Sequence, residues 1–157
     1  MFGSRLVRAA ALTVALSLAV SGCAAEPDPE DVDARASSID VLQTEDVGKV
    51  LVDGEGAVLY VFAPDLAEAV SCTFTCATNW PPFVASESVT PDAGDGVEQA
   101  LLGSLKNPSG GEVITYNGWP LYRYAADKKP GDHTGQDRYL NGGDWFVMAP
   151  SGKPRTS

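Results

Sequence analysis

Apolar and polar residues alternate along the chain from residue 48 onward. The segment 49–62, KVLVDGEGAVLYVF, contains two such runs around a glycine-containing turn at 53–56. The segment 112–125, EVITYNGWPLYRYA, has the same layout, with Asn117–Gly118 at its turn. An Asn-Gly pair between alternating runs favours a tight hairpin, because both central residues of that turn need positive φ. The pattern therefore predicts two antiparallel β-hairpins.

The pattern predicts a further strand at 144–150, DWFVMAP, and a weaker one around Phe83. Between the hairpins, apolar residues recur four apart in 95–108, DGVEQALLGSLKNP, and so share one helical face. Asp95 with Glu98 resembles a capping box, and the pair at 107–108, Asn-Pro, would end the helix. We therefore expect one short helix between the two halves.

Both hairpins lead into the same phrase, YVFAPD at 60–65 and YRYAAD at 122–127. Trp80 and Trp145 follow the two copies, and the second copy has three more residues between its Asp and its Trp. The matched positions are Leu59 and Leu121, Tyr60 and Tyr122, Phe62 and Tyr124, Ala63 and Ala125, and Asp65 and Asp127. This is an internal duplication, and a single hairpin cannot bury its apolar face alone.

The predicted fold is mainly β. Two tandem pseudo-symmetric repeats, at about 48–90 and 110–152, pack their antiparallel hairpins as a small sandwich or barrel-like domain. This domain covers 45–152, and 153–157 is a tail.

The N-terminus is typical of an exported protein. Arg5 and Arg8 precede a largely apolar 12-residue run at 9–20, which is shorter than the roughly 20 residues of a membrane-spanning helix. The next residues, VSGC at 20–23, resemble a bacterial lipobox, which implies cleavage after residue 22 and acylation of Cys23. A lipid on Cys23 would anchor the exported protein to the extracytoplasmic face of the cell membrane. The alternative is an ordinary secreted protein with an incidental Cys23.

Residues 23–44 are acidic and carry prolines, so we expect a disordered tether. The net charge of −10 becomes −12 once the two arginines of the signal peptide are removed. A surface this acidic argues against nucleic acid as a partner.

These residues resemble a family of bacterial and archaeal lipoproteins with a repeated Tyr-x-aromatic-x-x-Asp motif, the secreted repeat of unknown function. The resemblance rests on both phrases, on a cysteine pair followed by WPP at 80–82, and on PGDHTGQ at 130–136 followed by DWFV at 144–147. Several members carry Gly where this chain has Asp137. The resemblance implies the fold and the location, and it implies no reaction.

Cys72 and Cys76 are separated by three residues. Export places them in an oxidising compartment, where a structural disulfide is the expected state. Redox or thiol-exchange chemistry and metal ligation are the alternatives, although the spacing differs from that of thioredoxin-like sites.

Asp65 and Asp127 admit two interpretations. Each can accept hydrogen bonds from the amides of its own loop at the end of a strand. Alternatively the two carboxylates approach each other, as in glycoside hydrolysis or in a site for a hard cation. Duplication favours the first interpretation, because a residue that determines the fold must recur in each copy.

The aromatic residues of the phrases, Tyr60 with Phe62 and Tyr122 with Tyr124, share one face of each strand and are expected in the core. His133 is the only histidine, lies in a polar loop, and is expected to be solvated. It cannot build a transition-metal site alone.

The sequence favours a non-enzymatic envelope lipoprotein, a binding or structural module with no catalytic residue, cofactor or metal. Its partners would be the membrane, through the lipid anchor, and an unidentified envelope protein or small ligand. Two other hypotheses stay open: a redox accessory protein that uses Cys72 and Cys76, and a carbohydrate-active enzyme that uses Asp65 and Asp127.

Overall fold

The structure is a computed structural model that describes residues 38–65, 69–84 and 91–156. The predicted signal peptide, Cys23 and most of the predicted tether lie outside the described residues. The elements are β1 Ile39–Gln43, β2 Lys49–Asp53, β3 Tyr60–Phe62, the 3-10 turn η1 Ala63–Asp65, α2 Thr75–Asn79, the 3-10 turn η2 Gln99–Leu101, β4 Leu102–Lys106, β5 Glu112–Tyr116, β6 Trp119–Pro120, β7 Arg138–Leu140 and β8 Gly143–Val147.

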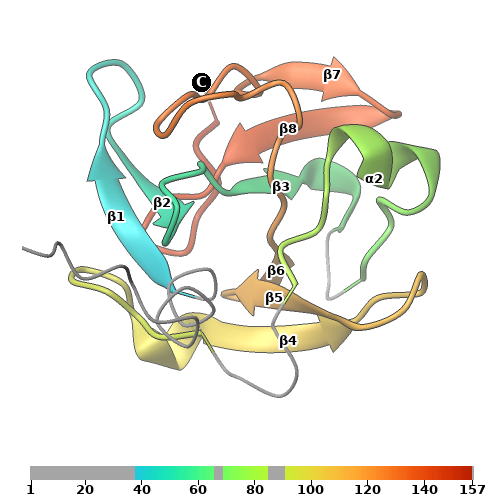
Figure 1. Cartoon of the computed structure of the whole chain (residues 1–157), viewed down its shortest axis with the longest axis horizontal. Coiled ribbons are helices and arrows are strands. Elements are labelled where there is room, and N and C mark those ends of the chain that lie inside the picture. The colour runs from blue at the N-terminus through green and yellow to red at the C-terminus, as the bar shows by residue number, and fades with distance from the viewer. Residues whose placement is uncertain (1–37, 66–68, 85–90, 157) are drawn as a thin grey trace, which may run out of the picture.

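The strands form three small antiparallel sheets, ordered β1-β2, β3-β8-β7 and β4-β5-β6 (Figure 1). Across the described residues these sheets do not close into a barrel. The prediction of a mainly β fold with antiparallel pairing is confirmed. The first predicted hairpin is only partly formed, because β2 and β3 belong to different sheets and meet at the isolated bridge between Val52 and Val58.

Both predicted turns are present. In the first, Gly56 takes a φ of +83° and donates its N–H to the Asp53 carbonyl at 2.8 Å. In the second, Asn117 and Gly118 have φ values of +52° and +79°, so both central residues are left-handed as a tight hairpin turn requires. The pattern of alternation and the turn residues therefore fixed both corners locally.

The helix predicted over 95–108 is wrong. This segment contains the 3-10 turn η2 and then strand β4, which pairs with β5 along its whole length. A short isolated helix with Gly103 in its interior is marginal, whereas the strand satisfies the free edge of β5. The one α-helix of the described residues is α2, inside the first repeat.

The predicted tether is too long at its C-terminal end. Strand β1 lies within residues 23–44, where Ile39 is fully buried and is held by backbone hydrogen bonds to residues 92 and 94. Val41 and Leu42 pack against the core from the same strand. Burial of these three apolar residues, together with the pairing of β1 with β2, therefore orders this end of the segment although the residues before it are acidic.

The residues after Trp80 run beside the second repeat. Isolated bridges join Pro82 to Tyr122 and Val84 to Val113, which agrees with the weak strand predicted around Phe83. The rest of that predicted strand, 85–89, lies outside the described residues.

The two repeats meet at the tyrosines that open their phrases. The Tyr60 N–H donates to the Tyr122 carbonyl at 2.8 Å, and the Tyr122 N–H donates to the Tyr60 carbonyl at 2.9 Å. Both side chains are fully buried. This reciprocal pair relates the halves by a pseudo-twofold axis, and the aromatic core forms around it.

Gly135 tests how tightly this core is packed. A Cβ atom placed there would lie 2.7 Å from the Trp80 ring and 2.9 Å from the Tyr60 ring. We expect Gly135→Ala to destabilise the fold by about 1–3 kcal/mol, because two fully buried rings have no room to move. The measurement is chemical denaturation. A Gly135→Ala variant that is as stable as the parent protein would contradict this account.

Candidate functional site

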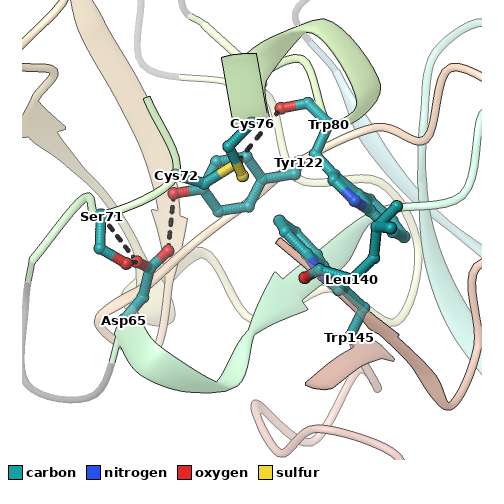
Figure 2. The surroundings of a disulfide bond; sticks show 8 residues. All are labelled: Asp65, Ser71, Cys72, Cys76, Trp80, Tyr122, Leu140 and Trp145. Carbon is teal, nitrogen blue, oxygen red and sulfur yellow. Dashed lines mark hydrogen bonds between the residues drawn. A yellow bond between two sulfur atoms is a disulfide. The ribbon is translucent and has the colours of Figure 1, made fainter. Parts of the chain in front are cut away.

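The two repeats exchange hydrogen bonds through their phrases. The Tyr60 hydroxyl donates to Oδ2 of Asp127 at 2.6 Å, and the Tyr122 hydroxyl donates to Oδ2 of Asp65 at 2.6 Å. Figure 2 shows the second of these pairs beside the disulfide. Each acid is thus bonded by the tyrosine of the other repeat, so the phrases form one site across the pseudo-twofold axis.

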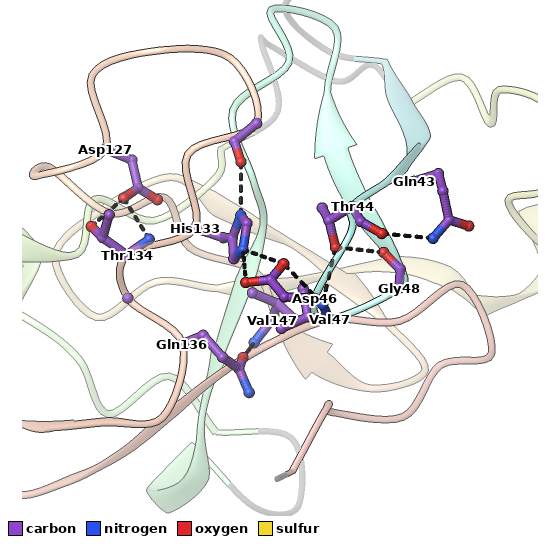
Figure 3. A network of polar contacts seen from close by, with 12 residues as sticks. Gln43, Thr44, Asp46, Val47, Gly48, Asp127, His133, Thr134, Gln136 and Val147 are labelled. Carbon is purple, nitrogen blue, oxygen red and sulfur yellow. Dashed lines mark hydrogen bonds and ion pairs between the residues drawn. The ribbon is translucent and has the colours of Figure 1, made fainter.

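The remaining carboxylate oxygen of each acid holds its own loop. Oδ1 of Asp65 accepts from the N–H of Ser71 at 2.8 Å and from the Ser71 hydroxyl. Oδ1 of Asp127 accepts from the N–H of Thr134 at 3.0 Å and from its hydroxyl at 2.6 Å (Figure 3). The sequence analysis foresaw the loop amides but missed both hydroxyl residues. Their positions, six and seven residues after the Asp, are the signal that could have identified them.

The two halves of the site differ in burial. Asp65 is 1% exposed, and this desolvation raises the pKa of its carboxyl against the lowering effect of the bonds from Ser71 and Tyr122. Asp127 is only half-buried. The pKa values of Tyr60 and Tyr122 are raised, first by burial and then by the carboxylate that each phenol bonds. Both tyrosines are therefore held as neutral donors.

Four aromatic rings stack between the repeats. Centroid distances are 4.3 Å from Phe62 to Trp145, 3.8 Å from Trp145 to Trp80, and 4.1 Å from Trp80 to Tyr124. The two tryptophans are parallel to within 2°. We call Phe62, Trp145, Trp80 and Tyr124 the aromatic stack.

Tyr60 and Tyr122 meet the aromatic stack edge-on. The Tyr60 ring lies 5.3 Å from Trp80, and the Tyr122 ring lies 5.3 Å from Trp145. Tyr60, Phe62 and Tyr122 thus lie in the core, as the sequence analysis expected, whereas Tyr124 is half-buried and packs against it. The stacking across repeats was not foreseen, because it depends on the pseudo-twofold axis.

Cys72 and Cys76 form a disulfide with a Cα–Cα distance of 5.2 Å. The cysteines are 1% and 8% exposed. The bond lies directly after Ser71 and beside Tyr122, so it supports the loop that holds Asp65 (Figure 2). Between the cysteines, Phe74 is 78% exposed and takes a φ of +50°, which is unusual for a bulky residue.

The expectation that His133 is solvated is wrong. Its Nδ1 lies 2.8 Å from the Gly131 carbonyl, and its Nε2 lies 2.9 Å from Oδ1 of Asp46 (Figure 3). The bond to Asp46 is the main cause that raises the pKa of His133, and it lowers the pKa of Asp46 in turn. This ion pair ties the long loop of the second repeat to the β1–β2 turn.

A second ion pair also joins the repeats. The guanidinium of Arg123 lies 2.5 Å from Oδ2 of Asp53, which is 1% exposed. Oδ1 of Asp53 accepts the backbone N–H groups of Glu55 and Ala57 in the turn of the first hairpin. The sequence analysis missed this pair, because nothing in the local pattern connects residues 70 positions apart.

Within the part of the chain that the structure describes, no three His, Cys, Asp or Glu residues gather in a way that could hold a metal ion. A search of the same residues for a helix of membrane-spanning length and hydropathy also finds none.

A protein-family model described as a secreted repeat of unknown function, from a lipoprotein family, matches the chain twice. The matched segments are 41–84 and 103–149, one for each repeat. The chain therefore belongs to this family of secreted repeats, and the resemblance stated on the phrases is confirmed. No curated protein and no solved structure matches this chain.

Asp137, which stands where several members carry Gly, has a φ of +56°. Glycine adopts this left-handed conformation without a steric penalty, and aspartate is among the few other residues that tolerate it. Asp137 therefore takes a backbone conformation that a glycine at this position could also adopt.

The unequal burial of the two acids predicts unequal effects of removing the phenol oxygens. Tyr122→Phe leaves a carboxylate that is 1% exposed short of one donor, so we expect a loss of about 2–3 kcal/mol. Tyr60→Phe leaves the half-buried Asp127, which water can hydrate, so we expect about 1 kcal/mol. Thermal and denaturant unfolding measure both losses. Tyr139→Phe, at a 72% exposed site, is the control, and a larger loss for Tyr60→Phe would refute the account.

The His133–Asp46 pair predicts a pH dependence of stability. Because folding raises the pKa of His133 above its ordinary value of 6.5, the native state binds more protons than the unfolded state. The stabilisation is complete below that ordinary pKa and is lost as pH rises through the folded pKa. Denaturant unfolding between about pH 5 and 9 should show this decrease. His133→Gln and Asp46→Asn should each make the free energy of unfolding less dependent on pH over this range. If both variants keep the decrease, another group causes it.

Proposed function

We propose that this chain is a membrane-anchored, extracytoplasmic lipoprotein that acts as a binding or structural module of the cell envelope and catalyses no reaction. The observation that carries the proposal is the bonding of Asp65 and Asp127. Each carboxylate accepts three hydrogen bonds from groups of the fold. An acid held in this way serves to close a loop, and the family's repeated motif then has a structural purpose.

The same bonding weighs against a carbohydrate-active enzyme. A general acid must reach a substrate oxygen within hydrogen-bond distance, and Asp65 is 1% exposed behind Ser71 and Tyr122. A redox accessory role for Cys72 and Cys76 is weakened by their burial, because thiol exchange needs an accessible sulfur.

Anchoring is supported by the N-terminal sequence and by the family. VSGC at 20–23 follows a short apolar run of signal-peptide length, and the family is one of secreted lipoproteins. With the signal peptide removed, the net charge of −12 repels an anionic membrane face. The lipid would then hold the folded domain near the membrane while the domain itself stays off the surface.

Replacement of the acylated cysteine tests the anchor. We expect Cys23→Ser to move the protein from the membrane fraction to the medium and to abolish incorporation of labelled fatty acid. Ser21→Ala keeps a small residue in the lipobox and should stay membrane-bound. If Cys23→Ser stays in the membrane fraction and still incorporates labelled fatty acid, Cys23 is not the site of the lipid anchor.

The binding role is tested in the membrane where the chain resides. Crosslinking of the anchored protein, followed by its purification, should recover a defined envelope partner or small ligand. The Cys72→Ser, Cys76→Ser double variant provides the control with a perturbed fold and should lose that partner. Recovery of the same species by both proteins would indicate adhesion through the tether and would contradict binding by the domain.

A further inference from the structure

The aromatic stack is a continuous path of rings in van der Waals contact. Its three centroid distances lie between 3.8 and 4.3 Å, and the central tryptophans are parallel to within 2°. Rings in this arrangement share the positive charge left when one electron is removed, and tryptophan and tyrosine are the side chains that are oxidised most readily in this way. Core packing explains why the rings are buried, but it does not determine how the stack reacts with an oxidant.

Each of the two edge-on tyrosines has a base in place. A phenol that loses an electron becomes strongly acidic, so its oxidation requires that its proton leave at once. The hydroxyls of Tyr60 and Tyr122 donate to the carboxylates of Asp127 and Asp65 at 2.6 Å. Removal of the electron and transfer of the proton can therefore occur together.

The tryptophans lack such a base. Trp145 Nε1 donates to the Leu140 carbonyl at 3.0 Å, and a carbonyl does not accept the proton outright. Trp80 Nε1 is buried and has no hydrogen-bond partner among the described residues. A positive charge on either indole stays delocalised and mobile until it reaches a tyrosine that can be deprotonated.

The two ends of the stack differ in access. Phe62, at one end, is 4% exposed and is hard to oxidise. Tyr124, at the other end, is half-buried and lines a surface recess of about 290 Å³ with Lys128, Lys129 and Pro130. The guanidinium of Arg138 lies 5.8 Å from the Tyr124 ring. This cation disfavours positive charge on Tyr124 and so drives that charge inward.

We propose that the aromatic stack is a sink for one-electron oxidants, in which Trp80 is oxidised through the stacked ring of Tyr124 and the oxidation ends at Tyr60 or Tyr122. A peroxyl radical takes one electron from the stack and one proton from water and becomes a hydroperoxide, leaving hydroxide in solution. The phenol of Tyr60 or Tyr122 supplies the electron and becomes a neutral tyrosyl radical, and its proton passes to Asp127 or Asp65. The lipid anchor is not needed for this chemistry.

The test uses photogenerated tris(bipyridine)ruthenium(III) as the oxidant of the full chain, in a Tyr139→Phe background that removes an exposed tyrosine. We expect rapid formation of a neutral tyrosyl radical, detected by transient absorption and electron paramagnetic resonance. In the Tyr60→Phe, Tyr122→Phe double variant this rapid signal is lost and a tryptophan radical persists. Rapid tyrosyl formation that survives in the double variant would overturn the proposal.

Three further measurements keep the test decisive if the double variant folds poorly. In heavy water, radical formation in the protein with an intact core should slow, and an unchanged rate would contradict transfer of the proton to the carboxylates. Tyr124→Leu should lower the yield, and an unchanged yield would refute entry through the stack. Tyr116→Phe is the matched control, because Tyr116 is equally buried but its hydroxyl donates to the Pro150 carbonyl at 2.8 Å and to no carboxylate. We expect this variant to keep the tyrosyl signal. Loss of the signal would place the radical on Tyr116 and would contradict the proposal.

Discussion

The exchange of hydrogen bonds between Tyr60 and Asp127, and between Tyr122 and Asp65, is the constraint on which the rest of the fold depends. A buried carboxylate is costly unless donors surround it, and each repeat supplies only the serine or threonine donors of its own loop. The missing donor comes from the other repeat. Asp65, which is 1% exposed, therefore depends on the second repeat for its burial. The tyrosine backbones, paired at 2.8 and 2.9 Å, set the spacing at which both hydrogen bonds form together.

Around this shared centre the two copies have diverged. In the first repeat Asp65 is 1% exposed, and the disulfide between Cys72 and Cys76 directly follows Ser71, which holds this acid. In the second, three more residues separate the acid from its tryptophan, and the longer loop is fastened by His133 to Asp46 instead. The indoles also differ, since Trp145 Nε1 donates a hydrogen bond and Trp80 Nε1 finds no partner within the described part of the chain. A covalent crosslink and a titratable ion pair thus perform equivalent tasks in the two halves.

The sequence predicted what neighbouring residues determine. The turns at 53–56 and 117–118 formed as expected, because positive φ at Gly56, Asn117 and Gly118 is a local requirement. The helix over 95–108 did not form, because its residues 102–106 pair with β5 as strand β4. Val97, Leu101 and Leu105, which would have shared one face of the helix, still pack against the core in this arrangement. The partner of each acid could not be predicted, because it follows from how the repeats face each other.

A motif that recurs for structural reasons changes where function should be sought. If the Tyr-Asp phrases close the fold, then recognition depends on features that only one repeat has. Phe74 is one, an exposed aromatic ring held at a φ of +50° on the disulfide loop, and strain of this kind is retained where surrounding structure enforces it. The two lysines of the recess beside Tyr124 are another, because the matched positions 66 and 67 of the first repeat are apolar in the sequence. The duplicated residues make one rigid centre, and the unduplicated ones on its surface distinguish this chain from a plain pair of repeats.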